Sequence, residues 1–393
     1  MGLKFSGRLN YDSLEMEISA GRLPRMIMIF SLALPMTTMC RATTQASLTE
    51  QADALFAGLI SNQGPGAAVL VVKDGRAVFE RGYGVTDLRA MRRIDGRTNF
   101  RLASVTKQFT AAAVMLLVRD GKLHYDDSLT SIFPGFPDYG RAITIRHLLN
   151  HTSGLPDYED LMPPAGPSVP VEEVQIKDAG VLELLERQKA GTFVPGTRWA
   201  YSNSGYVVLG LVVEKVSGRP FSEFLHDRVF APLGMTNTVA YERGKNRVAD
   251  RAYGHTGDLG RWSETDQSPT SATLGDGGVY SSLSDLAKWD EALRRHTLLS
   301  ETDMRPALVP VQVPAEPPAE PDGTPAAYGF GWFLNPWKGH ARMWHYGETV
   351  GFRTAVERFT ADGLTVIVLC NRADLDAAAL ALKTADIYMN GSR

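Results

Sequence analysis

Apolar residues alternate with polar ones near both ends of the chain, and they follow helical spacing between those ends. The stretches 66–75 and 76–84 are typical of two strands around an Asp-Gly turn. Strand patterns return at 327–334, 341–348, 352–359 and 364–370. Strands joined by tight turns cannot form parallel crossovers, so we expect a largely antiparallel sheet. A lone hairpin is marginally stable, so the first hairpin should join the C-terminal strands.

Helical spacing fills the middle of the chain. The stretch 104–122 predicts a helix with Ser104 at its start and Gly121 at its end. The stretch 144–155 predicts a short helix that runs into a turn, and further helices are predicted at 179–190, 205–218, 220–235, 282–300 and 373–389. The pattern predicts an α+β fold in which a sheet lobe is interrupted by an inserted all-helical lobe. The sheet lobe covers about 47–103 and 270–393 and the helical lobe about 104–269, with a ligand cleft expected at the seam.

Residues 1–46 have a different character. Arg22 and Arg25 precede the short apolar run 26–36, and small polar residues follow it. This order is typical of a secretory signal, and the apolar run is too short to span a bilayer. We therefore expect an exported protein, periplasmic or secreted, with an amphipathic or disordered tail as the alternative. A lipid anchor on Cys40 is disfavoured because methionine is a poor residue just before such a site.

Composition excludes several classes of protein. The chain has 393 residues and a net charge of −3, which indicates neither a nucleic-acid groove nor a basic membrane-binding face. It has two cysteines, Cys40 and Cys370, which allow one disulfide at most and no cysteine-based zinc site. No nucleic-acid partner and no membrane span in the mature form are therefore predicted.

Ser104 and Lys107 lie three residues apart at the start of the predicted helix 104–122, so they share a face. A helix N-terminus offers free N–H groups that stabilise negative charge. The apolar residues after the lysine would shield it from water and lower its pKa, so that it could accept the serine proton. The alternative is a capping serine beside a solvated lysine. No other lysine in the chain has a serine three residues before it.

A second candidate group is Tyr201-Ser202-Asn203, just before the predicted helix 205–218. A tyrosine near two cations could be a phenolate or share a proton, which would give a base close to Ser104. The amide of Asn203 could hold a substrate carbonyl or the lysine. The alternative is a turn asparagine beside a packed aromatic ring.

Four motifs occur in order along the chain: "SVTK", "LLNHTSGLPDY", "PGTRWAYSNSGYVVLG" and "GDGGVYSSLSDLAKW". Together they resemble the serine β-lactamase-related hydrolases, relatives of class C β-lactamases that include D-Ala carboxypeptidases, D-aminopeptidases and esterases. The resemblance covers roughly residues 50–390 and implies the fold predicted above, a β-lactamase/transpeptidase-like one. It also implies that Ser104 is the acylated nucleophile, Lys107 its proton partner, Tyr201 a second acid/base and Asn203 a substrate contact.

This family also carries Lys- or His-x-Gly on an edge strand beside the cleft. Two triplets fit, one beginning at His345 and one at His255. We choose His345 because it lies in a strand pattern, whereas His255 lies in a polar loop. Gly347 would then let the substrate approach the backbone closely. The backbone N–H of Glu348 would complete an oxyanion hole with that of Ser104.

Histidine at this position departs from the lysine that β-lactamases usually carry. A mostly neutral imidazole at His345 and the negative charge of Glu348 predict weak recognition of carboxylate-bearing lactams or D-Ala peptides. Esters or neutral amides should be turned over better. We therefore predict a serine hydrolase that forms an acyl-enzyme with a small-molecule or peptide-like ester or amide.

Two alternatives stay open. Within the enzyme class, the chain could be a true β-lactamase or a D-alanyl-D-alanine carboxypeptidase. From another class, it could be a non-catalytic penicillin-binding or scaffold module, although the intact candidate residues argue against that. His147 and His151 stand four apart on a predicted helix, but no third ligand accompanies them, so packing is favoured over metal binding. No metal or organic cofactor is predicted, and the oligomeric state is not defined by the sequence.

Overall fold

The first predicted hairpin is present in the computed structural model of the protein. Strands β1 (Ala67–Lys73) and β2 (Arg76–Tyr83) pair antiparallel. Asp74 and Gly75 connect them with φ of 52° and 76°, the left-handed angles that a two-residue type I′ turn requires. An Asp-Gly pair adopts such angles readily, which explains why the turn is readable from the sequence.

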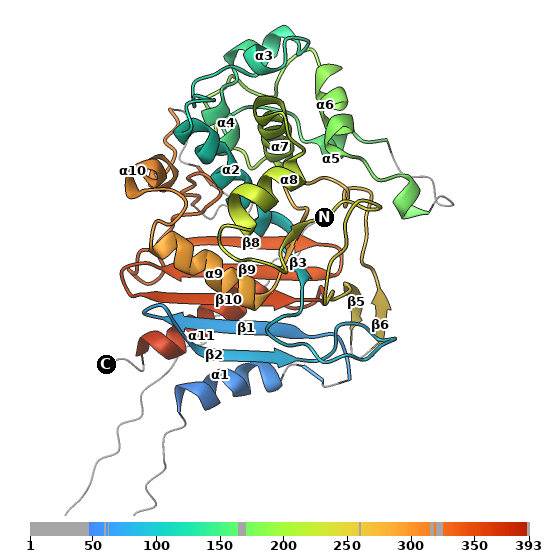
Figure 1. The fold of residues 1–393 in the computed structure, drawn as a ribbon, viewed down its shortest axis with the longest axis vertical. Coiled ribbons are helices and arrows are strands. Elements are labelled where there is room, and N and C mark those ends of the chain that lie inside the picture. The colour runs from blue at the N-terminus through green and yellow to red at the C-terminus, as the bar shows by residue number, and fades with distance from the viewer. Residues whose placement is uncertain are drawn as a thin grey trace, which may run out of the picture. The chain divides into compact units, whose positions relative to one another are not determined.

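This hairpin joins three C-terminal strands in one five-stranded sheet, in the order β2-β1-β10-β9-β8 (Figure 1). The C-terminal strands are β8 (Met343–Thr349), β9 (Phe352–Phe359) and β10 (Leu364–Cys370). All four pairings in the sheet are antiparallel, as predicted. Because β8 lies at the edge, one side of its backbone is not paired with another strand of this sheet.

Alternate residues of β1 face two separate apolar cores. Val69 and Val71 face the core formed with α1 (Leu48–Ala57) and α11 (Ala377–Asn390), which cover one side of the sheet (Figure 1). Leu70 faces the other core, which contains α9 (Leu283–Arg294) and the helices of the chain's middle. With both faces covered, β1 is buried along most of its length, which fits its continuous apolar sequence.

The segments between β2 and β8 are mostly helical; most of them gather beyond the β8 edge of the sheet, while α9 (Leu283–Arg294) lies across a face of the sheet (Figure 1). Helices α2 and α7 pack against each other at the centre of this group. The helical segments are η1 (Ala103–Thr106), α2 (Lys107–Arg119), α3 (Leu129–Ile132), η2 (Asp138–Ala142), α4 (Ile145–Leu149), α5 (Tyr158–Leu161), η3 (Val171–Glu173), α6 (Asp178–Glu186), α7 (Asn203–Ser217), α8 (Phe221–Leu225), η4 (His226–Phe230), α9 (Leu283–Arg294), α10 (Glu301–Met304) and η5 (Arg305–Leu308).

Short strands that the sequence analysis did not predict fix the segment before α2. They are β3 (Phe100–Arg101), β4 (Val239–Ala240) and β7 (Val279–Ser281), with a separate hairpin of β5 (His255–Asp258) and β6 (Arg261–Glu264). Strand β7 lies between β3 and β4. Its pairing with β3 therefore places the residues that lead into η1 beside the glycine-rich segment 275–278, which precedes β7.

Three predicted elements differ from the structure. The helix expected at 104–122 begins as the 3₁₀ turn η1, and α2 itself starts at Lys107. The stretch 327–334 is not a strand and forms isolated bridges instead. A Cβ on Gly329 would lie 1.9 Å from a backbone oxygen, and Gly331 has φ of 75°, so the chain bends tightly there. The predicted polar loop at His255 is a strand.

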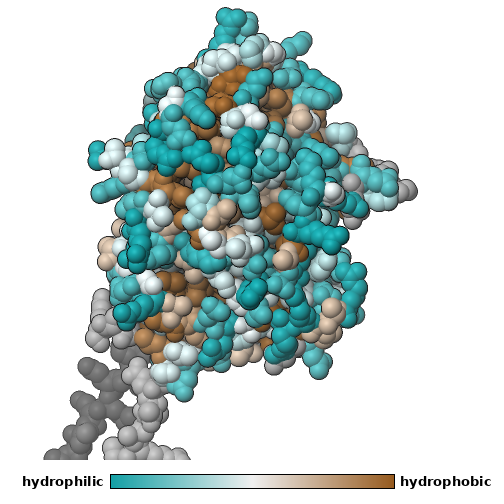
Figure 2. Space-filling view, in the orientation of Figure 1, coloured by the Kyte–Doolittle hydropathy of each residue, from teal (hydrophilic) through white to brown (hydrophobic). Residues whose placement is uncertain are grey.

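The structure describes residues 47–390 except 59, 62, 164–169, 259–260, 315–317 and 320–324. The predicted export signal and Cys40 therefore lie outside the described residues. Within the described part, no helix is long and apolar enough to cross a membrane. On the face shown in Figure 2, apolar residues appear in separate patches between hydrophilic ones.

Candidate active site

Ser104 lies in η1, where the chain leaves β3 and turns towards α2. The residue before it, Ala103, has φ of 49°, a left-handed conformation that costs about 1–2 kcal/mol for a residue with a side chain. Thr354 Oγ1 donates a hydrogen bond to the carbonyl of Leu102 at 2.8 Å, which ties this turn to β9. The serine is thus held at the edge of the sheet by a strained turn that its neighbours stabilise.

The Lys107 side chain is completely buried beneath Ser104. Its Nζ donates to Ser104 Oγ at 3.1 Å, to Asn203 Oδ1 at 2.9 Å and to the backbone carbonyl of Asp276 at 3.0 Å. Burial lowers the pKa of Lys107 from 10.5 to about 8, and the nearby charge of Asp276 opposes that shift. With that pKa about a tenth of the amine is neutral at pH 7, and Ser104 lies within its reach.

Tyr201 is the second group at Ser104. Its phenol hydrogen-bonds to Ser104, and Lys107 Nζ lies 4.9 Å from the centre of its ring. Burial raises the pKa of Tyr201 well above its usual value. Of the two forms that the sequence analysis considered, the raised pKa favours a protonated phenol that shares a proton over a phenolate, and Lys107 faces its ring. The neutral phenol can still donate and accept a proton in turn.

The edge strand β8 brings a backbone N–H to the serine. A Cβ on Gly347 would lie 2.2 Å from the Leu102 carbonyl oxygen and 3.1 Å from the Ser104 nitrogen, so only glycine allows this approach. Trp344 exchanges both backbone hydrogen bonds with Phe333, which lies outside the sheet. Because pairing directions alternate along a regular strand, the N–H of Glu348, four residues on, also points away from β9. It faces the open edge where Ser104 lies.

His345 does not line the pocket beside Ser104. Its ring is 1% exposed and packs behind Tyr201, with ring centroids 6.2 Å apart. Nδ1 donates to the Tyr346 carbonyl at 2.6 Å, so Nε2 of the neutral ring accepts the Tyr328 hydroxyl at 3.1 Å. Burial and Lys107 lower the pKa of His345 to about 3. It is neutral, as the sequence analysis expected, but it touches the tyrosine rather than a position open to substrate.

A small pocket opens beside the serine. Ser104, Asn203 and Glu348 lie on its wall together with Asp276 and Arg101. Its volume is about 60 Å³, room for one or two water-sized groups. The structure thus brings four predicted residues into contact, Ser104 with Lys107 and Tyr201, and Lys107 with Asn203.

The sequence analysis did not assign a role here to His151 or Asp276. His151 is fully buried, and its Nδ1 accepts the Ser202 N–H at 3.1 Å. His147 accepts the Thr144 N–H instead, and no group of three metal-ligating residues occurs among the described residues. The signals were present in "LLNHTSGL" and "GDGGVY", but spacing alone could not connect them to Ser104.

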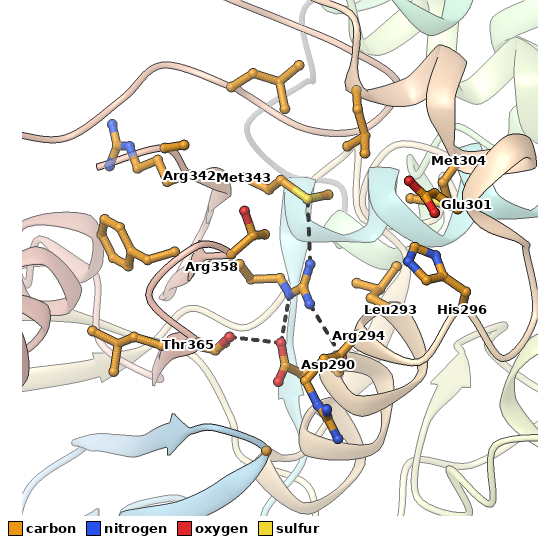
Figure 3. Close-up of a pocket in the computed structure, with 18 of the residues that line it drawn as sticks. Asp290, Leu293, Arg294, His296, Glu301, Met304, Arg342, Met343, Arg358 and Thr365 are labelled. Carbon is orange, nitrogen blue, oxygen red and sulfur yellow. Dashed lines mark hydrogen bonds and ion pairs between the residues drawn. The ribbon is translucent and has the colours of Figure 1, made fainter. Parts of the chain in front are cut away.

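A second pocket of about 520 Å³ lies between α9 and the ends of the C-terminal strands, and no predicted site residue lines it (Figure 3). Three of its polar side chains, Asp290, Arg358 and Thr365, are bonded to one another. Arg358 Nε and Thr365 Oγ1 both donate to Asp290 Oδ1, at 2.6 and 2.8 Å. The carboxylate beside the Thr365 hydroxyl is ion-paired with Arg358, whereas the amine beside Ser104 has no such ion pair among the described residues, so we place the chemistry in the pocket at Ser104.

Comparison with known proteins gives consistent matches over most of the chain. Residues 47–388 match the family model described as Beta-lactamase. The chain is 33% identical over 339 residues to penicillin-binding protein 4* of Bacillus subtilis, covering 82% of this chain and 72% of that protein. It is 32% identical over 332 residues to a D-aminopeptidase of Cereibacter sphaeroides, covering 82% of this chain and 60% of the relative. The chain therefore spans about three-fifths of that relative's length.

Solved structures share the fold. The octameric penicillin-binding protein homologue from Pyrococcus abyssi has a TM-score of 0.73 at 26% identity, covering 87% of this chain and 77% of that one. The D-amino acid amidase from Ochrobactrum anthropi SV3 has a TM-score of 0.73 at 23% identity, covering 88% and 99%. At that identity, the second likeness shows the fold alone. Together with the sheet described above, these matches confirm the predicted fold class.

Proposed function

The chain belongs to the β-lactamase family and is a serine hydrolase of that kind, and from this premise we propose that Ser104 is its nucleophile and Lys107 the base that activates it. One observation carries the proposal: a fully buried amine lies 3.1 Å from the hydroxyl of a half-buried serine. A buried lysine without a carboxylate against its Nζ is unfavourable for stability alone, so a catalytic role accounts for it.

Acylation follows from the contacts. The neutral amine of Lys107 takes the proton of Ser104 Oγ as that oxygen bonds to the substrate's carbonyl carbon. The carbonyl oxygen becomes an oxyanion, for which the N–H groups of Ser104 and Glu348 are the donors. When the intermediate collapses, the bond to the leaving group breaks, and Tyr201 passes a proton to that group while receiving one from Lys107.

Deacylation uses the same groups in reverse. A water takes the leaving group's place and gives a proton towards Tyr201 and Lys107 as its oxygen bonds to the acyl carbon. The ester bond to Ser104 then breaks and the serine regains its proton. Asn203 holds the lysine in place through its Oδ1 and leaves its amide N–H₂ for a substrate carbonyl.

The substrates proposed are esters and amides whose acyl part carries no carboxylate. His345 is neutral and buried, so it supplies no charge for a carboxylate. Glu348 and Asp276 line the pocket, and like charges repel. The relatives named D-aminopeptidase support amides as well as esters. A true β-lactamase or a D-alanyl-D-alanine carboxypeptidase stays the alternative within the class.

Labelling with a fluorophosphonate tests the proposal directly. The adduct should appear on Ser104 in an intact-mass and peptide-mapping experiment, and Ser104→Ala should remove both the adduct and at least a hundredfold of ester turnover. The partly exposed Ser217, which ends α7, supplies a control variant, Ser217→Ala, which should label like the parent protein. A scaffold module would give no adduct with the fluorophosphonate or with a penicillin.

Export is proposed as well, on the basic, apolar and small-residue order of residues 22–46. The test is expression of the full chain in a bacterial host, followed by fractionation and determination of the N-terminus. A shortened chain in the periplasm or medium supports export, and an intact chain confined to the cytoplasmic fraction contradicts it.

A further inference from the structure

A pocket separate from the candidate active site lies between α9 and the ends of the C-terminal strands (Figure 3). Its volume of about 520 Å³ falls in the range of small-molecule binding sites. No residue that lines the pocket at Ser104 lines this one. Most of its lining residues are apolar, including Leu293, Met304, Leu308 and Met343. Leu308 is 40% exposed, so the apolar wall continues to the mouth of the pocket.

Arg358 places a buried guanidinium in the wall of this pocket. The residue is 7% exposed and pairs with Met343 across β8 and β9. Among the described residues, its Nη1 donates only to Met343 Sδ, at 3.5 Å, and its Nη2 only to the Asp290 carbonyl, at 3.4 Å. A thioether is a weak acceptor, and 3.4 Å is long for an N–H···O hydrogen bond. The outer edge of the guanidinium therefore lacks a good acceptor (Figure 3).

Arg342, another buried arginine that lines the pocket, has stronger partners. Its Nε donates to the Asn335 carbonyl and its Nη1 to Glu357 Oε2, both at 2.8 Å. Buried polar groups in folded proteins are nearly always hydrogen-bonded, and a buried donor left without a good acceptor is unfavourable. The outer edge of Arg358 is therefore the position in this pocket where an oxygen atom of a ligand would be bound.

The charge of Arg358 is already balanced inside the protein. Its Nε lies 2.6 Å from Asp290 Oδ1, and the Thr365 hydroxyl donates to the same oxygen at 2.8 Å. A ligand carboxylate would add a second negative charge beside Asp290 in a mostly apolar pocket, which is unfavourable. A ligand ammonium would bring further donors to a guanidinium edge that lacks an acceptor. An uncharged carbonyl oxygen accepts from the N–H groups of Arg358 and adds no charge.

We propose that this pocket binds an uncharged small molecule with an apolar body and one carbonyl oxygen, and that Arg358 donates to that oxygen. The apolar body lies along Leu293 and Met304 towards Leu308 at the mouth. Burial of apolar surface there supplies the affinity, and the hydrogen bond from Arg358 selects the head group. The site does not depend on the role of Ser104, so its failure would leave the proposed function intact.

Four compounds with the same phenylalkyl body test the head group: 4-phenylbutan-2-one, butylbenzene, 3-phenylpropanoate and 3-phenylpropylammonium. They end in a ketone, a hydrocarbon, a carboxylate and an ammonium, and the ketone is used because a hydrolase does not cleave it. Calorimetric titration of the full chain near neutral pH should show the ketone binding at least tenfold more tightly than each of the others, the effect of one hydrogen bond to a charged group. Equal affinity for the ketone and butylbenzene, tighter binding of either charged compound, or no binding of the ketone would overturn the proposal.

Two neighbouring substitutions locate the bound ketone. Leu308→Asp places a charge at the mouth of the pocket, where the apolar body of the ligand lies, and should weaken ketone binding at least tenfold. Val309→Asp is the matched control, because Val309 is the next residue along the chain, is 59% exposed and does not line the pocket. Its affinity should stay within twofold of the parent. Unchanged binding by Leu308→Asp would place the ketone elsewhere and contradict the proposal.

Arg358→Lys tests the donor. It keeps a positive charge beside Asp290, but the shorter ammonium group does not offer a second donor edge to the pocket. The affinity for the ketone should fall about tenfold, while that for butylbenzene should change less than twofold, a selective loss that a merely loosened pocket would not give. Arg353→Lys, on the same strand and outside the pocket lining, is the control. An unchanged ratio of the two affinities in Arg358→Lys would exclude Arg358 as the donor, and the Leu308 and Val309 variants decide the location even where Arg358→Lys does not fold.

Discussion

The imidazole of His151 lies against the phenol ring of Tyr201, with ring centroids 4.4 Å apart and planes inclined by 34°. The same residue holds the backbone on both sides of that tyrosine. Its carbonyl accepts the Ala200 N–H at 3.0 Å, and its Nδ1 accepts the Ser202 N–H at 3.1 Å. His151 therefore positions Tyr201 from three directions without touching Ser104.

Removing the ring should reduce kcat more than it changes KM. We expect His151→Leu to lower kcat by about tenfold to a hundredfold, since misplacing a catalytic group by about 1 Å has that effect. His151→Asn should recover part of the loss, because its side-chain oxygen can accept the Ser202 N–H. Steady-state kinetics on one ester decides this, with His147→Leu as the control. A fall in protein stability with unchanged kcat would show that His151 contributes to packing and does not position Tyr201 for the reaction.

The activity should follow the ionisation of Lys107. Only its neutral amine accepts the serine proton, and its pKa is lowered to about 8. On a substrate without a titrating group, kcat/KM should therefore rise with pH and level off above about 8. Lys107→Arg should be at least a hundredfold less active at every pH, because a guanidinium does not lose its proton. The exposed Lys189→Arg is the control. A profile flat from pH 6 to 9 would assign the base elsewhere.

Gly347 should tolerate no side chain. A methyl group would clash with the Leu102 carbonyl and press on the Ser104 nitrogen, which would displace β8 and separate the two oxyanion donors. We expect Gly347→Ala to lower kcat by about a hundredfold, the effect of losing one such donor. Gly135→Ala is the matched control, since a Cβ there meets nothing within 4 Å. Parent-like turnover by Gly347→Ala would exclude β8 from the oxyanion site.

The fold could be predicted from the sequence where neighbouring residues determine the local structure. The Asp74-Gly75 turn and the apolar strands specify antiparallel pairing, and the five-stranded sheet has it. The stretch 327–334 was misjudged because the packing of Gly329 against a distant backbone oxygen, rather than apolar spacing, sets its path. Short strands such as β3 form only through pairing with residues far along the chain, so no local sequence pattern predicts them.

The candidate site, like the fold, could be predicted from the sequence only in part. The contact of Ser104 with Lys107 follows from their spacing, although a 3₁₀ turn rather than a regular helix provides it. Asn203 meets Lys107 from 96 residues away, one of the two roles that the chemistry of its amide allowed and between which the sequence could not choose. The burial of His345 and the unpartnered oxygen of Asp276 depend on three-dimensional packing, so the sequence carried no sign of either.

The acidic surroundings of the site should also appear in the stability of the protein. Asp178 begins α6, and burial together with Asp276 raises its pKa from 3.8 to about 7. Between these values the folded protein keeps a proton that the unfolded chain has lost. The contribution of Asp178 to the free energy of unfolding therefore falls as pH rises from about 4 to about 7, because the folded state binds more protons at this residue in that window.

Asp178→Asn removes this titration and keeps an oxygen for the N–H groups of Leu274 and Gly275. The variant should gain stability relative to the parent between about pH 5 and pH 8, by on the order of 1 kcal/mol. Urea unfolding of the variant and the parent at pH 5 and at pH 8 measures the difference in their free energies of unfolding. The control is Asp138→Asn, because Asp138 forms an exposed ion pair with Arg141. The same difference at both pH values would mean that Asp178 is ionised throughout, and that its neighbours offset the unfavourable burial of its charge.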